Sequence, residues 1–365
     1  MEYVEVVIVK MNRRIKTLIF LITLFLSITF VSGCNVMRTT PAYKYKITTT
    51  LYPQYEFVKA IIGDNDKIKN LFEVTLIVPP GVDSHTFDPR LTDLIEIKNS
   101  DLFIYTSDDL ETWVKDLHVA TYTKIVDLSQ DERIEFLEVN EEEYVDSSHH
   151  DHHHHTHSID PHFWVYPIYA SYMVDTIRNE MINLLNKPKS GSQVVNQDLI
   201  EIFNNNADNY IAKLLEIDEA IKVVRSNAKV TTMYFASPFS FYYWSHYYDL
   251  EYVLTYSTCS TEVEPPLTTI IHVINEIRKH DIKVIYVKEL LSTSVARMIS
   301  NQTGAEIVLL HSCHNISKLD LQNNVTFLKL MQDNVKYLAQ GLNVDLSCVP
   351  CFDESGVNTN AINWI

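Results

Sequence analysis

The feature that most constrains the fold is an alternation of short β-rich runs with helical patterns, which occurs twice along the chain. The first series places β-rich runs at residues 45–51, 74–78, 102–105 and 124–128. The second series places them at residues 229–234, 252–256, 284–287 and 307–310. Strands that alternate with helices form βα units, whose parallel sheets are covered on both faces. The sequence therefore predicts an α/β fold with two similar lobes, each a four-stranded parallel sheet with flanking helices.

A helical region separates the two series. Residues 168–185 have helical apolar spacing, and a break that contains Pro188 and Gly191 follows. A longer helical pattern then occupies residues 194–224. A helix of about thirty residues is about 45 Å long, because each residue adds about 1.5 Å. That length matches two small domains, so we expect one long rigid helix to join the lobes.

These patterns divide the 365 residues into expected segments. The predicted order is a signal peptide at 1–33, a tether at 34–42, an N-terminal lobe at 43–165, a helical region at 166–227 and a C-terminal lobe at 228–365. The linker helix is expected at 193–227. An acidic, histidine-rich loop at 138–159 is expected to interrupt the N-terminal lobe. Such a chain is long enough for two domains.

The amino-terminal segment indicates where the protein works. A basic stretch follows Met11, which is an alternative start, and an apolar run occupies residues 18–30. This run is too short to span a membrane comfortably and is typical of a signal peptide. It ends in VSGC (residues 31–34), which resembles the lipobox of bacterial lipoproteins. The resemblance implies that Cys34 is lipidated and becomes the first mature residue; a signal anchor with a chance cysteine is the alternative.

Charge and cysteine content limit the classes of function. The net charge of −17 opposes binding to the phosphates of nucleic acids. The chain has seven glycines and no phosphate-binding glycine motif, which disfavours nucleotide binding. A protein outside the membrane meets oxidising conditions, in which four cysteines allow three pairings. The cysteines that either pair or stay free are Cys259, Cys313, Cys348 and Cys351.

A dense histidine tract lies in the middle of the chain. It comprises His149, His150, His152, His153, His154, His155 and His157. Imidazole is the commonest protein ligand for zinc and copper, so the tract indicates contact with metal. The alternatives are a disordered polar tail and a purification tag; the tag is disfavoured because the tract is internal. The tract alone does not distinguish metal transport from storage or catalysis.

Two more histidines lie in loops beside predicted strands and helices. His85 lies in PGVDSHTFDP (residues 80–89), between a strand and a helix. His162 lies in DPHFWVYP (residues 160–167), directly before a helix. Loops after the carboxyl ends of strands bind ligands in open α/β sheets. Each histidine taken alone also fits an ordinary hydrogen-bonded loop residue.

Together these segments resemble the zinc/manganese ABC-transporter solute-binding proteins. Further matching segments are TTLYP (49–53), LETWV (110–114), TEVEPP (261–266) and TGA (303–305). The resemblance covers nearly the whole mature chain. It implies two α/β lobes, a long rigid connecting helix and a metal site in the cleft between the lobes.

The sequence departs from the ligand pattern of this family at two positions. The family's third ligand falls on Pro238, in SPFSFYY (residues 237–243), and proline has no donor atom in its side chain. The family's fourth ligand, an aspartate, falls on His311. The resemblance therefore implies a metal site made of His85, His162 and His311. A tract imidazole or one of three other residues would complete it: His314, Cys313 and His246.

This resemblance implies a specific function. The nitrogen-rich ligand set favours Zn²⁺, and Mn²⁺ is less favoured because it prefers more oxygen ligands. We expect a monomeric, lipid-anchored receptor on the outer face of the bacterial cytoplasmic membrane, which delivers zinc to an ABC permease and its ATPase for uptake. One alternative is an adhesin-type surface lipoprotein with the same fold and a degenerate metal site. Another is a zinc hydrolase, because three histidines and a water also describe catalytic zinc, but HExxH and nucleophile motifs are absent from the sequence.

Overall fold

The computed structural model describes residues 44–119, 122–140, 157–186, 197–256 and 264–349, which belong to one compact unit. Cys34, Cys259, Cys351 and the histidines at 149–155 lie outside the described residues. Among the described residues, we find no helix with both the length and the apolar character needed to cross a bilayer.

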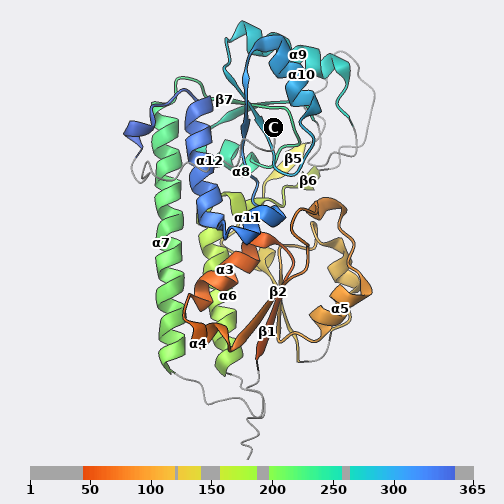
Figure 1. The fold of residues 1–365 in the computed structure, drawn as a ribbon, viewed down its shortest axis with the longest axis vertical. Coiled ribbons are helices and arrows are strands. Elements are labelled where there is room, and N and C mark those ends of the chain that lie inside the picture. The colour runs from red at the N-terminus through yellow and green to blue at the C-terminus, as the bar shows by residue number, and fades with distance from the viewer. Residues whose placement is uncertain (1–43, 120–121, 141–156, 187–196, 257–263, 350–365) are drawn as a thin grey trace, which may run out of the picture. The chain divides into compact units, whose positions relative to one another are not determined.

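The first lobe is built on a four-stranded parallel sheet (Figure 1). Its strands are β1 (Tyr45–Thr49), β2 (Phe72–Leu76), β3 (Leu102–Tyr105) and β4 (Lys124–Asp127), in the order β2-β1-β3-β4. Ile47 of β1 pairs with Val74 of β2 and Leu102 of β3. Its helices are α3 (Tyr52–Ile62), α4 (Asp66–Lys69) and α5 (Leu91–Lys98). Every residue of β3 is buried, as expected for a parallel strand with both faces covered.

The second lobe repeats this architecture. Its strands are β7 (Thr232–Phe235), β8 (Glu251–Leu254), β9 (Val284–Val287) and β10 (Glu306–Leu309), in the order β10-β9-β7-β8. Its helices are α8 (Tyr242–Tyr248), α9 (Leu267–Lys279), α10 (Ser294–Thr303), α11 (Lys318–Gln322) and α12 (Phe327–Gly341). The prediction of two four-stranded parallel sheets with flanking helices is confirmed.

Two long helices connect the lobes. They are α6 (Pro167–Asn186) and α7 (Gln197–Asn227), and α7 contains 31 residues. Helix α7 packs against α3 and α6 and also against α8 and α12, so it contacts helices of both lobes (Figure 1). Its buried side chains, such as Phe203, Tyr210 and Leu214, recur at helical spacing and form one apolar stripe. The expected long linker helix is therefore present.

One hydrophobic core extends through both lobes. It includes Ile47 in the first sheet, Phe203 in α7 and Tyr286 in the second sheet. Trp164 and Trp244 are fully buried, and their indole N–H groups donate to Ser312 O at 2.8 Å and Val165 O at 2.7 Å. Because protein interiors are close-packed, this shared core restricts movement of one sheet against the other.

Two further segments belong to the first lobe. The LETWV segment (110–114) leads into a 3₁₀ helix at Thr112–Asp116. The buried Glu111 carboxylate accepts the N–H groups of Thr106 and Ser107, and this holds the chain in a tight turn before the helix. The histidine-rich loop leaves from a hairpin of β5 (Glu138–Asn140) and β6 (His157–Ile159). The other 3₁₀ helices are η1 (Ser84–Thr86), η3 (Leu128–Gln130), η4 (Phe163–Val165) and η5 (Leu346–Cys348).

Candidate metal centre

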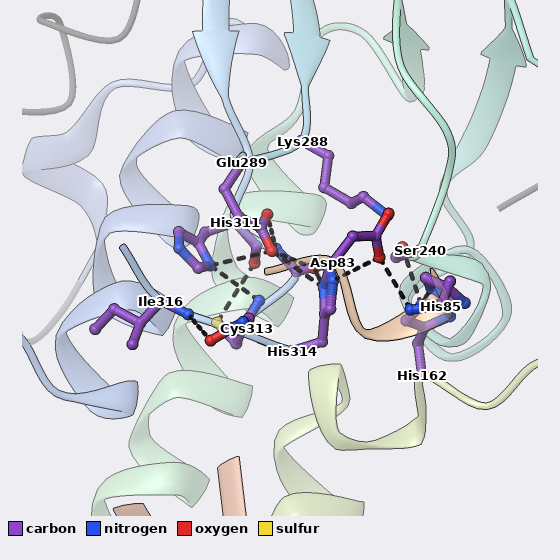
Figure 2. A network of polar contacts seen from close by, with 12 residues as sticks. Asp83, His85, His162, Ser240, Lys288, Glu289, His311, Cys313, His314 and Ile316 are labelled. Atoms are coloured by element: carbon purple, nitrogen blue, oxygen red, sulfur yellow. Dashed lines mark hydrogen bonds and ion pairs between the residues drawn. The ribbon is translucent and has the colours of Figure 1, made fainter. Parts of the chain in front are cut away.

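Three segments that follow strands converge at the candidate site (Figure 2). His85 lies in η1, after β2 of the first lobe. His162 lies between β6 and η4, and His314 lies in the loop after β10 of the second lobe. His162 and His314 are buried, and His85 is half-buried. Both lobes therefore contribute imidazole groups to one place.

His85 and His162 face each other through their Nε2 atoms. These two nitrogens lie 3.3 Å apart, and the hydroxyl of Ser240 lies 3.2 Å from His162 Nε2. Two nitrogens that bind one zinc ion at about 2.0–2.1 Å, with tetrahedral geometry, lie about 3.3 Å apart. The spacing of the two histidines therefore matches a shared tetrahedral metal ion.

Asp83 and His314 complete a cluster with His85. Each of these three side chains offers a ligand atom within 4.8 Å of the other two. Asp83 Oδ1 lies 3.8 Å from His314 Nε2 and also accepts the N–H of His85 at 3.0 Å. His162 adjoins this cluster through the 3.3 Å contact of its Nε2 with His85 Nε2, so three nitrogens and one carboxylate lie near one another, and zinc commonly takes four ligands.

Hydrogen bonding fixes the tautomer of His162. Its Nδ1 lies 2.6 Å from Asp160 Oδ1, and both side chains are buried. A carboxylate accepts but does not donate, so Nδ1 carries the proton and Nε2 keeps its lone pair. Metal-binding histidines commonly have such an outer carboxylate, because it orients the ring and raises its basicity. Asp160 therefore prepares His162 to bind a cation through Nε2.

The electrostatic surroundings keep two of the imidazoles neutral. Burial, with the nearby His162, Lys288 and His314, lowers the pKa of His85 to about 2. Burial also lowers the pKa of His162, although Asp160 opposes the shift. Neutral imidazoles have a free lone pair, so both rings are in the form that binds metal.

The pKa of His314 shifts the other way. Burial lowers it, but Asp83 and Glu289 raise it more, and the pKa lies above its ordinary value. Burial would raise the pKa of the Asp83 carboxyl, but the nearby His314 and the hydrogen bond from the backbone N–H of His85 lower it well below its usual range. The cluster therefore presents a carboxylate that attracts a cation.

Comparison with known proteins identifies the family. The family model described as "Zinc-uptake complex component A periplasmic" matches residues 47–341. The chain belongs to this zinc-uptake family. Its members are extracytoplasmic binding components of transport systems, not enzymes. The family resemblance and the binding-protein class that the sequence predicted are confirmed.

Relatives in this zinc-uptake family cover most of the chain. The high-affinity zinc uptake system protein ZnuA of Bacillus subtilis is 28% identical over 302 residues, which cover 82% of this chain and 88% of ZnuA. The zinc-binding lipoprotein AdcA of Streptococcus pneumoniae is 28% identical over 312 residues, or 85% of this chain, but these cover only 58% of AdcA. This chain therefore spans less than two thirds of the AdcA relative.

Solved structures show the same fold. The Zn(II)-bound ZnuA-like domain of Streptococcus pneumoniae AdcA is 25% identical and superposes with a TM-score of 0.65, covering 82% of this chain and 99% of that domain. The metal-dependent lipoprotein YcdH of Bacillus subtilis is 26% identical with a TM-score of 0.65, covering 82% of this chain and all of YcdH. These similarities confirm the two-lobed fold of the zinc-uptake family.

His311 is placed apart from this cluster. Its Nδ1 accepts the N–H of Cys313 at 2.9 Å, and its backbone N–H and C=O bind the side chain of Asn334, each at 2.7 Å. An Nδ1 atom that accepts a hydrogen bond leaves the proton of a neutral ring on Nε2. Figure 2 shows the ring on the far side of Glu289 from His85 and His162. The structure thus groups His314, rather than His311, with the other two histidines.

The other residues that the sequence singled out also lie apart from the cluster. Cys313 is a free, buried thiol in the hydrophobic core, and burial raises its pKa well above the ordinary value. Cys348 is a free, exposed thiol. His246 is exposed on α8, where its ring contacts Tyr247. Pro238 is buried two residues before the hydroxyl of Ser240.

Sequence reasoning did not identify three acidic residues near the cluster. Asp83 and Asp160 each lie two residues before a candidate histidine, a spacing that suits side-chain contact with the following backbone. Glu289 follows the fully apolar run of β9 and is buried. A buried charge is costly unless it is paired, so a partner for Glu289 is expected nearby. A search for charged residues directly after buried strands would have found Glu289.

The loop that carries His314 is tied to the first lobe. The N–H of Gly81 donates to Ile316 O at 2.8 Å, and the N–H of Tyr52 donates to His314 O at 3.4 Å. The side chain of Asn315 donates to the backbone oxygens of Pro79 and Val82. These bonds hold His314 in register with the loop that carries His85.

Replacing Asn315 by alanine should destabilise the protein by about 1–3 kcal/mol, because the carbonyls of Pro79 and Val82 lose their donors. Urea unfolding would measure this loss. Asn227→Ala is the matched control, since Asn227 is exposed and its side chain donates to Val223 O of its own helix. The control should change the free energy of unfolding by less than about 0.5 kcal/mol. An Asn315→Ala protein as stable as the parent would contradict the role of these bonds.

Proposed function

We propose that this chain is an extracytoplasmic receptor that binds Zn²⁺ through Asp83, His85, His162 and His314 and delivers it to an ABC transporter for uptake. The observation that carries the proposal is the 3.3 Å separation of the His85 and His162 Nε2 atoms, with Asp83 and His314 beside them. Membership in the zinc-uptake family and the zinc-binding relatives support it.

The composition of this ligand set favours zinc over manganese. Three imidazole nitrogens and one carboxylate oxygen suit tetrahedral zinc, whereas manganese prefers more oxygen ligands and higher coordination. The ZnuA-like domain of AdcA, which is 25% identical, is described as Zn(II)-bound. Zinc therefore fits both the chemistry of the side chains and the known chemistry of a relative.

The proposed set differs from the sequence-based one in its second-lobe ligand. His314 faces Asp83 and His85 with Nε2, whereas His311 holds its Nδ1 in a hydrogen bond with the Cys313 N–H and lies apart. Pro238 offers no ligand atom at the third position of the family pattern. Asp83 provides the fourth ligand from the same loop as His85.

Alanine at His85, His162 or His314 should each weaken zinc binding by more than about 100-fold, because loss of an outer partner alone costs about 10–100-fold. Asp83→Ala should also weaken it, by removing the only carboxylate of the proposed set. Isothermal titration calorimetry with a competing chelator would measure the affinities.

The controls are His311→Ala and His246→Ala. Neither side chain belongs to the proposed set, so each should change the zinc affinity by no more than about twofold. If His311→Ala abolishes tight binding while His314→Ala does not, the second-lobe ligand is the one that the sequence pattern indicated.

We propose that the histidine tract delivers zinc to this centre. The tract leaves from the β5–β6 hairpin, and β6 is followed directly by Asp160 and His162. The N–H of Asp160 donates to Leu137 O at 3.0 Å, and the hydroxyl of Tyr243 donates to Asp160 O at 3.0 Å. These bonds hold Asp160 beside the metal centre, and β6 before it begins at His157, the last histidine of the tract.

Replacing residues 147–156 by a short Gly-Ser link should lower the number of zinc ions bound but leave the tightest site unchanged. The reason is that all four proposed ligands lie outside the tract. A variant of the original length, with serine at each of the six histidines in this segment, is the matched control and should behave in the same way. Loss of the tightest site in both variants would show that the tract supplies a primary ligand.

We propose that the receptor is anchored to the membrane through lipidated Cys34, which lies outside the described residues. The VSGC segment and the zinc-binding lipoprotein relative support this. Cys34→Ser should move the protein from the membrane fraction to the soluble fraction or leave an uncleaved precursor, because acyl chains supply about 0.8 kcal/mol per buried CH₂. Normal processing and membrane retention of Cys34→Ser would contradict the anchor.

The adhesin-type alternative has weaker support. The laminin-binding protein Lmb of Streptococcus agalactiae, described as a bifunctional adhesin and metal transporter, has a TM-score of 0.64 but only 20% identity. That likeness shows the shared fold and no more. An adhesin-type protein with a degenerate metal site would lack a complete set of metal ligands. The zinc titrations above therefore also separate these two functions.

A further inference from the structure

The carboxylate of Glu289 lies behind His314, away from the proposed zinc ligands. Glu289 follows β9 by two residues and is only 6% exposed. Its Oε1 lies 3.2 Å from His314 Nδ1, while His314 Nε2 lies on the side of Asp83. Figure 2 shows His314 between Glu289 and the Asp83 carboxyl. Glu289 is therefore placed to act on zinc through His314.

Ser312 connects the two side chains and defines the direction of the hydrogen bonds. The N–H of Ser312 donates to Glu289 Oε2 at 2.8 Å, and its hydroxyl lies 2.5 Å from Glu289 Oε1. The same hydroxyl contacts His314 Nδ1. A carboxylate only accepts, so the single proton of the hydroxyl goes to Glu289, and the hydroxyl oxygen must accept from His314.

Both routes from Glu289 give the same tautomer of His314. The direct contact of Oε1 with Nδ1 and the relay through Ser312 each require a proton on Nδ1. In the neutral ring, Nε2 then keeps its lone pair and presents it toward Asp83 and His85. This is the form of histidine that binds a metal ion.

We propose that Glu289 is a positioning residue that fixes the tautomer and orientation of His314 and thereby sets the zinc affinity of the site. The inference rests on the proposed function, because it takes His314 as a zinc ligand. It parallels the pairing of Asp160 with His162, so each buried histidine ligand has its own outer carboxylate.

Glu289 also lies near His311, but His311 has the other tautomer. Oε1 is 3.7 Å from His311 Nδ1, but that nitrogen already accepts the N–H of Cys313 at 2.9 Å. The same carboxylate thus lies between two histidines that have different tautomers. Of these two histidines, His314 is the one that combines a protonated Nδ1 with an Nε2 that faces the other ligands. Glu289 therefore helps to select His314 over His311 as the ligand.

Glu289→Gln provides a directional test. The N–H of Ser312 still needs an acceptor, so the glutamine oxygen should take the Oε2 position and its NH₂ group the Oε1 position. That NH₂ group donates to the Ser312 hydroxyl, which then donates to His314 Nδ1. The proton of the neutral His314 ring moves to Nε2, where it blocks the metal.

Two measurements follow from this reversal. Long-range ¹H–¹⁵N imidazole spectra of the zinc-free protein, recorded at a pH high enough to make His314 neutral despite its raised pKa, should show protonated Nδ1 on His314 in the parent and protonated Nε2 in Glu289→Gln. Zinc affinity should fall by about 10–100-fold in Glu289→Gln. Ser312→Ala keeps the direct contact to Glu289, so it should keep the parent tautomer and lose less affinity.

Glu111→Gln is the matched control for losing a buried carboxylate. Glu111 is also buried after a strand, and it accepts from Thr50, Thr106 and Ser107 in the first lobe. Its substitution should lower stability without changing the His314 tautomer or the zinc affinity. If Glu289 had only a structural role, Glu289→Gln would behave like Glu111→Gln. Both variants would then lower stability and leave the His314 tautomer and the zinc affinity unchanged.

The outcomes separate this inference from the proposed function. A parent protein whose zinc-free His314 carries the proton on Nε2 would overturn the inference even if Glu289→Gln failed to fold. So would a folded Glu289→Gln with the tautomer and zinc affinity of the parent, while His314→Ala still lost zinc. A parent that binds no zinc, or a His85→Ala protein that binds it as tightly as the parent, would instead overturn the proposed function.

Discussion

The structure of the site depends on one property of imidazole: a neutral ring has one N–H group and one lone pair. A buried histidine can give its lone pair to a metal ion only if an acceptor takes the proton on its other nitrogen. Asp160 does this for His162, and Glu289 with Ser312 does it for His314. These outer carboxylates lie on separate segments, so the centre requires the folded chain as a whole.

The shared hydrophobic core holds the histidines and their outer carboxylates in place. Side chains from both sheets and from α6, α7 and α12 form one hydrophobic cluster. Buried charges such as Glu289 are costly unless they are paired, and the neighbouring histidines and lysine lower its pKa well below the usual value although burial raises it. Packing and electrostatics therefore support each other, since the core excludes water from the carboxylates that orient the ligands.

The sequence predicted the fold well because parallel strands buried on both faces are nearly continuous apolar runs, such as VIYV in β9. It also directed attention to His85 and His162, which follow strands. It placed His311 in the ligand set and His314 only among the further candidates, because the placement of the two rings depends on contacts with Cys313 and Glu289 that no sequence pattern shows. Cys313 has a left-handed backbone, with φ of 61°, and this local conformation between the two histidines is not encoded by any periodic pattern.

The cross-lobe bonds of the loop after β10 have a kinetic consequence. Gly81 N–H to Ile316 O and Asn315 to Pro79 O join the second-lobe ligand to the loop of the first-lobe ligands. The ligands therefore form a single mechanical unit, and parting the lobes would require these bonds to break first. Amide hydrogen exchange at Gly81 measures how often these bonds open.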